Sequence, residues 1–465
     1  MKVLLICLIL IAINANVNAE YKSYLNYKLY KVNPKNQDDV NTLKEIQNNG
    51  IGEFWNEYFR PEDDVRIMVE PSWENIFLER LKEAKLEVKL IFNNLQEIIY
   101  KQKAPRQAGT VRSANSFFSL DWDDYYDLEQ INHWLDELAE AYPNIVTTVV
   151  MGKSVEDRDI KGIKIDYHPE RTDKKIGFLE GTLHAREWIS TATITWIVKE
   201  FLTSSDPDVR AFAENLEWHI FPIVNPDGYV YTFTGNRMWR KNRSKTNFTS
   251  CGANVNDDMS NGVDLNRNFD FVWMTVGASN DPCSNLFAGP SPASEPETQA
   301  ISQYVLELSD RGEIIYYIAF HSYTQMFVIP FSHVASNQML AADNYANMFE
   351  IAVRSAEKLS QRFGTSYSVG IAANVLYPMS GTSFDWVKNY TNTRISYLIE
   401  LRDMGEFGFL LPASQIIPNN LEVMDGLIEM DKTTKLLGYY TTADASKIFY
   451  SLSVVIFGLM AILVV

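Results

Sequence analysis

Residues 176–201 read IGFLEGTLHAREWISTATITWIVKEF, and they combine a strand-like run with a helical one. The segment opens with the short apolar run Ile176–Leu179, typical of a buried strand, and ends with the helical stretch Thr191–Phe201. The same alternation returns later in the chain, with strand-like runs at Trp218–Val224, Ile314–Phe320 and Ile395–Glu400 and a helical stretch at Pro296–Leu308. Strands that alternate with helices predict an α/β fold with a mixed central sheet and helices on both faces.

A second, smaller unit precedes this sheet. Its elements are expected in the order strand, helix, two strands, helix and strand, at Tyr27–Val32, Asp38–Asn48, Glu53–Tyr58, Asp64–Val69, Pro71–Ala84 and Leu86–Ile91. That order is typical of a split βαβ unit, a small α+β domain. The basic, turn-rich stretch Lys101–Arg112 follows, and it resembles an exposed linker open to a trypsin-like protease at Arg106 or Arg112.

The two ends of the chain resemble processing signals. Met1–Ala19 has one early lysine, an apolar run and a small-residue ending, which favours a cleaved signal peptide over a signal anchor. The tail 438–465 joins small residues and a short spacer to an apolar end, which fits a glycosylphosphatidylinositol signal. A short C-terminal span and a buried helix are the alternatives for this tail. We therefore expect a protein of the secretory pathway, secreted or anchored at the outer membrane surface.

These features divide the chain into four segments. The expected boundaries are 1–19 for the signal peptide, 20–112 for the small domain and its linker, 113–437 for the main domain and 438–465 for the tail. With 46% hydrophobic and 22% charged residues, the 465-residue chain has the composition of a globular protein. Its formal charge of −17 argues against nucleic acid as a partner.

Cysteine usage agrees with an oxidising compartment. Cys7 leaves with the signal peptide, so Cys251 and Cys283 are expected to form one disulfide. Two free thiols would be the alternative, an unusual state outside the cytosol. Sequons for N-glycosylation begin at Asn242, Asn247 and Asn389, which is compatible with secretion, although such triplets often arise by chance.

One group of residues has the types and positions of metal ligands. His184 and Glu187 are three residues apart between the predicted strand and helix, so they can direct a nitrogen and an oxygen at one ion. Alone, this pair is common and is weak evidence for a metal, because a surface pair or a glutamate at a helix N-terminus explains it more simply. His321 favours the metal because it follows the strand Ile314–Phe320, and α/β enzymes carry functional groups at strand ends. Two imidazoles and one carboxylate would leave Zn²⁺ an open position, as in catalytic sites, so one zinc ion is expected.

Several motifs occur together in one order, and they carry a family resemblance. They are Gly181–Trp188, Asn236–Lys241, Gly262–Asn268, His321–Tyr323, Glu400–Gly405 and Phe409–Ile416. Over about residues 115–436 the chain resembles the digestive A/B metallocarboxypeptidases. This resemblance implies a monomeric enzyme that hydrolyses the last peptide bond of peptides with a free C-terminus. The small domain resembles that family's activation segment, which implies a zymogen activated by a trypsin-like protease.

The resemblance also assigns two catalytic roles. Glu400 is implied to be the general base and acid, which activates the attacking water and then protonates the leaving amine. Without the other motifs, a salt bridge to Arg402 would be the simpler interpretation. Arg240 is implied to polarise the scissile carbonyl and to stabilise the oxyanion. Only the motif distinguishes Arg240 from its basic neighbours, because a basic run is usually a solvated surface.

Substrate contacts follow from the same resemblance. Asn266 and Arg267 match the pair that holds the substrate's terminal carboxylate, and Tyr377 closes over it. Arg186 and Tyr323 are implied to line the approach. Without the order of motifs, Asn266 would be explained as part of a polar turn and Tyr377 as an aromatic residue of the core.

Phe384 stands where the family has the floor of the side-chain pocket. B-type enzymes resemble one another in having an acid there, so Phe384 implies an A-like preference for uncharged, hydrophobic chain ends. The next residue is Asp385. The family has an aspartate at this position in both types, so Asp385 does not indicate a B-type enzyme. The bulk of Phe384 and Met379 favours smaller aliphatic residues.

Two other classes of protein are less well supported. A catalytically silent receptor should lack a metal ligand or the base, and this chain has them all. A metalloendopeptidase is disfavoured because the His-Glu-x-x-His motif is absent and a carboxylate clamp is implied. The extra residues Ala253–Asn261, rich in Asn and Asp, are expected to extend a surface loop near the cleft.

Overall fold

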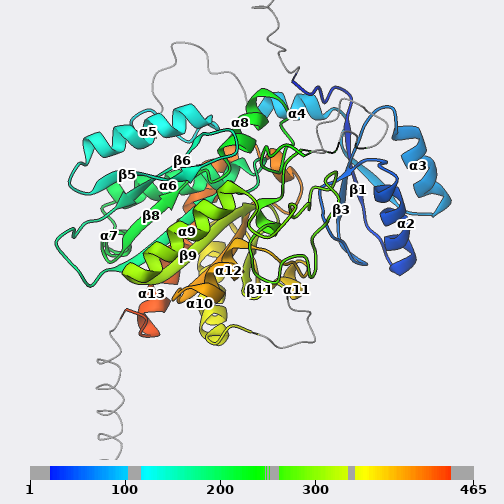
Figure 1. The fold of residues 1–465 in the computed structure, drawn as a ribbon. Helices are drawn as coiled ribbons and strands as arrows, with labels where there is room; N and C mark the ends of the chain where they lie inside the picture. The colour runs from blue at the N-terminus through cyan, green and yellow to red at the C-terminus, as the bar shows by residue number, and fades with distance from the viewer. Residues whose placement is uncertain are drawn as a thin grey trace, which may run out of the picture.

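The structure is a computed structural model that describes residues 21–102, 117–246, 248, 251, 261–333 and 341–440. Figure 1 shows two units side by side, a small N-terminal one in blue and a large one that runs from cyan to red. The predicted signal peptide, the cleavage positions Arg106 and Arg112 and the tail beyond residue 440 lie outside the described residues, as does nearly all of the Ala253–Asn261 insertion. No helix in the described ranges is both long and apolar enough to cross a membrane.

The small N-terminal unit, here called the N-domain, has the predicted element order. It contains β1 (Lys28–Val32), α2 (Gln37–Asn48), β2 (Glu53–Phe54), β3 (Val65–Val69), α3 (Glu74–Glu83), β4 (Val88–Phe92) and α4 (Leu95–Gln102). Its strands form an antiparallel sheet in the order β2-β3-β1-β4, and a core of their apolar side chains packs on α2 and α3. β2 ends at Phe54 and not at Tyr58 as predicted, because the chain leaves the sheet there to contact the large domain.

The large domain is built on the predicted mixed sheet. Its strands are β5 (Val146–Lys153), β6 (Asp159–Ile165), β7 (Lys175–Gly181), β8 (Glu217–Phe221), β9 (Glu313–Ser322), β10 (Met326–Ile329), β11 (Ser368–Ile371) and β12 (Ile395–Leu401). In space their order is β11-β10-β12-β9-β7-β8-β6-β5. The four central strands β12, β9, β7 and β8 run parallel. β10 and β6 join them in antiparallel pairing, and the outer strand β11 pairs parallel with β10 whereas β5 pairs antiparallel with β6. The carboxyl ends of the central strands therefore meet at one edge.

Helices cover both faces of this sheet, as predicted. One face packs against α5 (Leu128–Ala141), α6 (Trp188–Thr203), α7 (Pro207–Glu214), α8 (Pro226–Thr234), α10 (Tyr345–Phe363) and α13 (Ile416–Leu436). The other packs against α9 (Pro296–Arg311), α11 (Ala372–Val375) and α12 (Ser383–Tyr390). Along β9, Tyr316 and Ile318 belong to the first core and Tyr317 and Ala319 to the second, as strand alternation requires.

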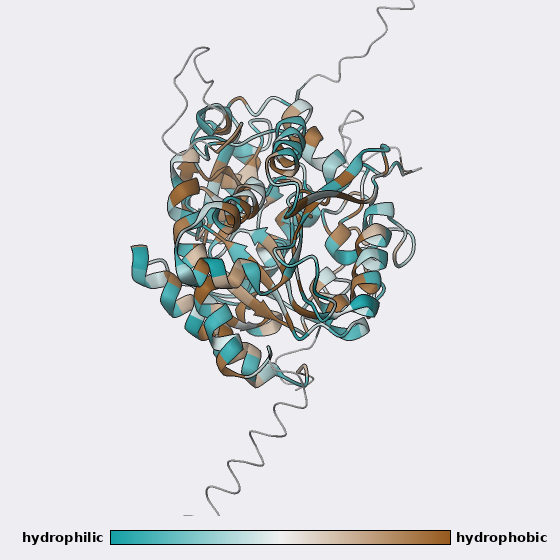
Figure 2. Cartoon of the chain, turned by 90° about the vertical axis from the view of Figure 1, so that its left-hand side faces the viewer, coloured by the Kyte–Doolittle hydropathy of each residue, from teal (hydrophilic) through white to brown (hydrophobic). Residues whose placement is uncertain are grey.

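Burial explains why these segments carry so few polar residues. The central strands are covered on both sides, so they read as continuous apolar runs and do not alternate with polar residues. Helix α6 is likewise buried on almost every side, because α13 covers its outer face and Asn420 accepts a hydrogen bond from Thr193 there. Figure 2 shows hydrophobic residues gathered in the strands and on the inward sides of the helices.

The N-domain packs directly on the large domain. A shared apolar cluster joins N-domain residues that include Trp55 to Tyr323 and Phe409 of the large domain. The Arg66 side chain also donates a hydrogen bond to the Gly405 carbonyl, over 2.6 Å. Since Tyr323 and Glu400 come from the edge where the central strands end, the N-domain lies over that edge.

Candidate active site

Three neighbouring strands deliver the candidate metal ligands and the candidate base. β7 ends at Gly181, three residues before His184, and β9 carries His321 near its end. β12 is paired in parallel with β9 so that Glu400 lies directly opposite His321. Residues that are far apart in the chain thus meet at the edge predicted from the sequence.

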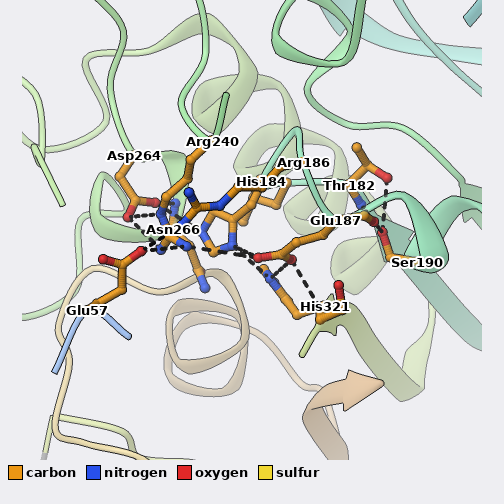
Figure 3. A network of polar contacts seen from close by, with 12 residues as sticks. Glu57, Thr182, His184, Arg186, Glu187, Ser190, Arg240, Asp264, Asn266 and His321 are labelled. Atoms are coloured by element: carbon orange, nitrogen blue, oxygen red, sulfur yellow. Dashed lines mark hydrogen bonds and ion pairs between the residues drawn. The ribbon is translucent and has the colours of Figure 1, made fainter. Parts of the chain in front are cut away.

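The three predicted ligands form one buried group. His184 Nδ1 lies 2.8 Å from Glu187 Oε1, and His321 Nδ1 lies 3.0 Å from Glu187 Oε2. The two Nδ1 atoms are 3.1 Å apart. Figure 3 shows both imidazoles and the carboxylate converging on one point. His184, Glu187 and His321 are a group that could hold a metal ion in the described part of the chain.

The chemistry of this donor set fits zinc. Two imidazole nitrogens that face each other so closely need a cation or a shared proton between them. Two nitrogens and one carboxylate oxygen are ligands that Zn²⁺ takes in catalytic sites, where the fourth position stays open. Burial lowers the pKa of His321, which favours the neutral imidazole that a metal requires. For Glu187, burial alone would raise the pKa, but the adjacent histidines hold it below its ordinary value.

Asp264 contacts the candidate ligand His184 on the ring nitrogen that faces away from Glu187 and His321. Its Oδ1 lies 3.1 Å from His184 Nε2, so it fixes the proton on that nitrogen and leaves Nδ1 free to face the metal. Its Oδ2 accepts two hydrogen bonds from Arg240, at 3.1 and 2.9 Å. Burial would raise the pKa of Asp264, but Arg240 and His184 lower it far below the ordinary value. Asp264 is therefore an anion that orients a candidate ligand and a candidate catalytic residue together.

Glu400 lies beside the metal group without a salt bridge. Its side-chain Oε2 is buried and has no hydrogen-bond partner among the described residues. The pairing with Arg402 that the sequence left open does not form, since Arg402 bonds Glu422 at 2.7 Å through its Nε. Burial, together with the nearby charge of Glu187, raises the pKa of Glu400 well above its ordinary value. Such a carboxyl group can hold a proton at neutral pH and release it to a stronger base.

Arg240 points into the same site from the motif after α8. Its Nη1 lies 3.9 Å from Glu187 Oε1, and the whole side chain is buried. Burial alone would lower its pKa, yet the carboxylates around it, Asp264 above all, raise it. Arg240 is thus a fixed positive charge held next to the metal group, in the position predicted for an oxyanion-stabilising residue.

The residues of the predicted carboxylate clamp lie close to one another. Arg267 donates to the Tyr377 hydroxyl over 2.7 Å, and its other guanidinium bonds go to the carbonyls of Gly277 and Asn266. Asn266 accepts a hydrogen bond from the backbone N–H of Ser383 at 3.0 Å, so its amide nitrogen is directed elsewhere.

Gly381 permits this arrangement of the clamp. Its φ of +72° lies in the left-handed region, and a side chain there would place a Cβ 2.2 Å from the Arg267 carbonyl. The clamp therefore depends on a glycine at this position.

One cavity contains most of the predicted substrate residues, but not all of them. Its lining includes the metal ligands His184 and Glu187, Glu400, Arg240, Asn266, Arg267, Tyr323 and Tyr377, with apolar wall from Leu376, Met379 and Leu398. Phe384 is fully buried in the core between the sheet and α12 and is not part of this lining. It packs in one apolar cluster with Tyr377, Met379 and Leu398, which line the cavity, and its assignment to the floor of the side-chain pocket stays a prediction.

Asp385, the acid next to Phe384, also points away from the cavity. Its Oδ2 accepts hydrogen bonds from the backbone and hydroxyl of Ser332, at 2.8 and 2.5 Å. Burial raises its pKa to about 7. The lining described above thus contains no acid from this segment of the chain.

The N-domain closes the cavity with two acidic side chains and an aromatic one. Glu57 lies 3.2 Å from Arg186 Nη2 and 3.4 Å from Arg240 Nη1, and Glu53 lies 3.0 Å from Arg186 Nη1. Figure 3 shows Glu57 entering from the N-domain side toward Arg240. Tyr58 stacks on Tyr377, with ring centroids 5.6 Å apart. Carboxylates of the N-domain therefore pair with two arginine side chains at the candidate active site.

Sequence reasoning missed two of these contributors. Asp264 lies inside the Gly262–Asn268 motif, so an acid two residues before the clamp was a usable signal. Glu57 had none, because its partners are more than 120 residues away in the chain. The predicted disulfide between Cys251 and Cys283 is present, with Cα atoms 5.5 Å apart.

Comparisons with known proteins agree with this geometry. A family model described as zinc carboxypeptidase matches residues 131–426, and one described as carboxypeptidase activation peptide matches residues 30–102. Zinc carboxypeptidase A 1 of Anopheles gambiae is 37% identical over 425 residues, which cover 91% of this chain and 93% of that protein. Zinc carboxypeptidase of Simulium vittatum is 40% identical over 321 residues, which cover 69% of this chain and 100% of that protein.

A solved structure extends the similarity to the fold of both domains. The crystal structure of carboxypeptidase A from Helicoverpa armigera has a TM-score of 0.76 and 27% identity, over 90% of this chain and 100% of that chain. The coverage includes the N-domain, which the activation-peptide model matches independently. The chain therefore belongs to the zinc carboxypeptidase family, as an exopeptidase that uses zinc and is made with its activation peptide.

Proposed function

We propose that the activated chain releases single, uncharged, hydrophobic residues from the C-termini of peptides. The observation that carries this proposal is one cavity lined by two of the metal ligands, His184 and Glu187, by the unpaired Glu400 and by the Arg267–Tyr377 pair. A clamp for a terminal carboxylate beside a hydrolytic centre selects the last peptide bond over internal ones. The proposal assigns the metal to His184, Glu187 and His321.

Glu400 is proposed to move the protons of the reaction. Zinc, when bound, supplies a Lewis acid that lowers the pKa of water and polarises a carbonyl. Glu400 accepts the proton of the attacking water and passes it to the nitrogen of the leaving residue. Its burial and its missing partner support this role, because a carboxylate held in a salt bridge would be a weaker base.

Arg240 is proposed to stabilise the oxygen that becomes negative during attack. Its guanidinium is held by Asp264, so it needs little reorganisation when charge develops on the substrate. Arg267 and Asn266 would bind the terminal carboxylate, with Tyr377 beside them and Arg186 and Tyr323 along the approach. The proposal is supported by the lining of the cavity, which contains all of these proposed substrate contacts except Arg186, and Arg186 pairs with Glu53 and Glu57 of the N-domain.

The preference for hydrophobic chain ends is supported by the apolar wall. Leu376, Met379 and Leu398 line the cavity next to the clamp. Asp385 is turned toward Ser332, and Phe384 adds no charge. A lysine or arginine side chain would find no partner on this wall, so aliphatic and smaller residues should be preferred.

Activation is proposed to need a trypsin-like cut in the linker near Arg106 or Arg112. The segments proposed for the finished protein are the N-domain with its linker, 20–112, and the catalytic domain, 113–437. We further propose that the chain is delivered to the secretory pathway and acts outside the cell as a monomer. Attachment to the membrane through the 438–465 tail stays a prediction of the sequence.

A direct test compares chain ends on the activated enzyme. Peptides that end in Phe, Leu, Val, Lys or Glu are offered after trypsin treatment, each also as its C-terminal amide and with a zinc chelator. The expected result is release of Leu, Val and Phe, at least about tenfold slower release of Lys and Glu, and no release from amides or with chelator. Fast release of Lys would overturn the proposed preference, and cleavage of the amides would overturn the proposed clamp.

A further inference from the structure

The sequons separate into two kinds once the fold is known. Asn242 and Asn389 lie in the described residues, and their environments are opposite. Asn242 has no exposed surface, whereas Asn389 is exposed near the end of α12. Nothing in the proposed reaction uses either asparagine.

The Asn242 amide is fully engaged inside the protein. Its Nδ2 donates to Glu295 over 2.7 Å and to Glu297 over 3.0 Å. Its Oδ1 accepts from the backbone N–H groups of Val263 and Ser244, at 2.8 and 3.2 Å. A sugar on Nδ2 would remove a donor from two buried carboxyl groups and would have to occupy filled space. The native fold therefore excludes a glycan at this position.

The Asn389 amide is in the opposite situation. Helix α12 begins at Ser383 beside the clamp, and Asn389 lies six residues later, about 9 Å along the helix axis. No described residue hydrogen-bonds its side chain, and its neighbour Tyr390 is 52% exposed. A glycan there would extend into solvent and would leave the cavity open. The third residue of this sequon, Thr391, is also present on the surface, at intermediate exposure.

We propose that Asn389 is an N-glycosylation site and that Asn242 is not one. The inference rests on the proposed delivery to the secretory pathway, where a polyprenyl-diphosphate oligosaccharide is the donor. The Asn389 Nδ2 forms a bond to C1 of the sugar and loses one proton, while the bond from C1 to the diphosphate breaks and the lipid diphosphate leaves. Transfer precedes folding, so the folded structure decides which modified chains can become native.

The test is site-resolved mass spectrometry of the full-length chain from secreting eukaryotic cells. An amidase that removes N-glycans is used in heavy-oxygen water, so that a glycosylated asparagine becomes a heavy-labelled aspartate. Label is expected at Asn389 and not at Asn242. The variant Asn389→Gln should lose one glycan in mass while its activity after trypsin treatment stays unchanged, since the residue is remote from the cavity.

The possible outcomes separate this inference from the proposed localisation. Secreted, active protein without label at Asn389 would overturn the site while the localisation stands. Label at Asn242 in active protein would overturn the argument from burial. Protein found only in the cytosol would overturn the localisation, and this inference with it.

Discussion

At the scale of single residues, Asp264 connects the two halves of the active site. One of its oxygens faces His184 and the other accepts hydrogen bonds from Arg240, so one buried carboxylate orients a candidate metal ligand and the guanidinium that we propose stabilises the oxyanion. Outer residues of this kind set the ring orientation and the basicity of a metal-bound histidine. Asp264 itself does not touch the reacting atoms, so it is a positioning residue.

The variant Asp264→Asn should keep the shape of the site and lose its charge. Zinc affinity is expected to fall by about ten- to a hundredfold, because His184 loses the acceptor that fixes its proton. Competition against a chelator of known affinity measures this change. The exposed Asp270, in the same loop, gives the matched control Asp270→Asn. Equal zinc affinity in both variants would contradict the role given to Asp264.

At the scale of elements, the short strand β2 explains how the N-domain reaches the cavity. The chain leaves the sheet after Phe54, and the next residues carry Glu57 and Tyr58 to Arg186, Arg240 and Tyr377. A strand that continued to Tyr58 would have kept these side chains on the sheet. The early end of β2 thus lets N-domain side chains contact the candidate active site.

The variant Glu57→Gln should raise the activity of the uncleaved precursor. Loss of a hydrogen bond between charged groups costs about 1.5 to 3 kcal/mol, which corresponds to about a tenfold or larger rise in precursor activity on a small substrate. Activity after cleavage should not change, because the N-domain is then gone. Rates before and after trypsin treatment check both statements.

A matched control for this variant lies in the same domain. Glu62→Gln removes an exposed carboxylate whose ion pair in the described residues is with Lys35 of the same domain. Its precursor should be as inactive as the wild type. If Glu57→Gln were equally inactive, the ion pairs with Arg186 and Arg240 would not be what closes the cavity.

At the scale of the whole molecule, the sequence predicted what depends on local pattern. Buried apolar runs identified the strands, and the end of β9 placed His321 beside His184 although 137 residues separate them. It could not predict contacts set by packing between domains, such as Glu57 with Arg240.

Stability should also respond to pH through Glu297, at the start of α9. Burial raises its pKa from the ordinary value to about 7. The folded state therefore binds the carboxyl proton of Glu297 more tightly than the unfolded state does. The contribution of this proton to the free energy of unfolding is complete at low pH and is lost as the pH rises through about 7. This contribution to the free energy of unfolding is at most about 3 kcal/mol.

The measurement compares unfolding temperatures at pH 5 and pH 8 for wild type, Glu297→Gln and the exposed control Glu307→Gln. Between these pH values the wild type should lose more stability than Glu297→Gln, and Glu307→Gln should follow the wild type. Parallel pH profiles for wild type and Glu297→Gln would show that Glu297 does not titrate in this range.

The most direct test of the whole account is the variant Glu400→Gln, assayed after trypsin activation on a blocked dipeptide that ends in Leu. Gln keeps the shape of the side chain but cannot take up a proton. We expect one bound zinc ion per molecule, as in the wild type, and a kcat lower by about 10²- to 10⁴-fold. Full zinc content with wild-type turnover would contradict it.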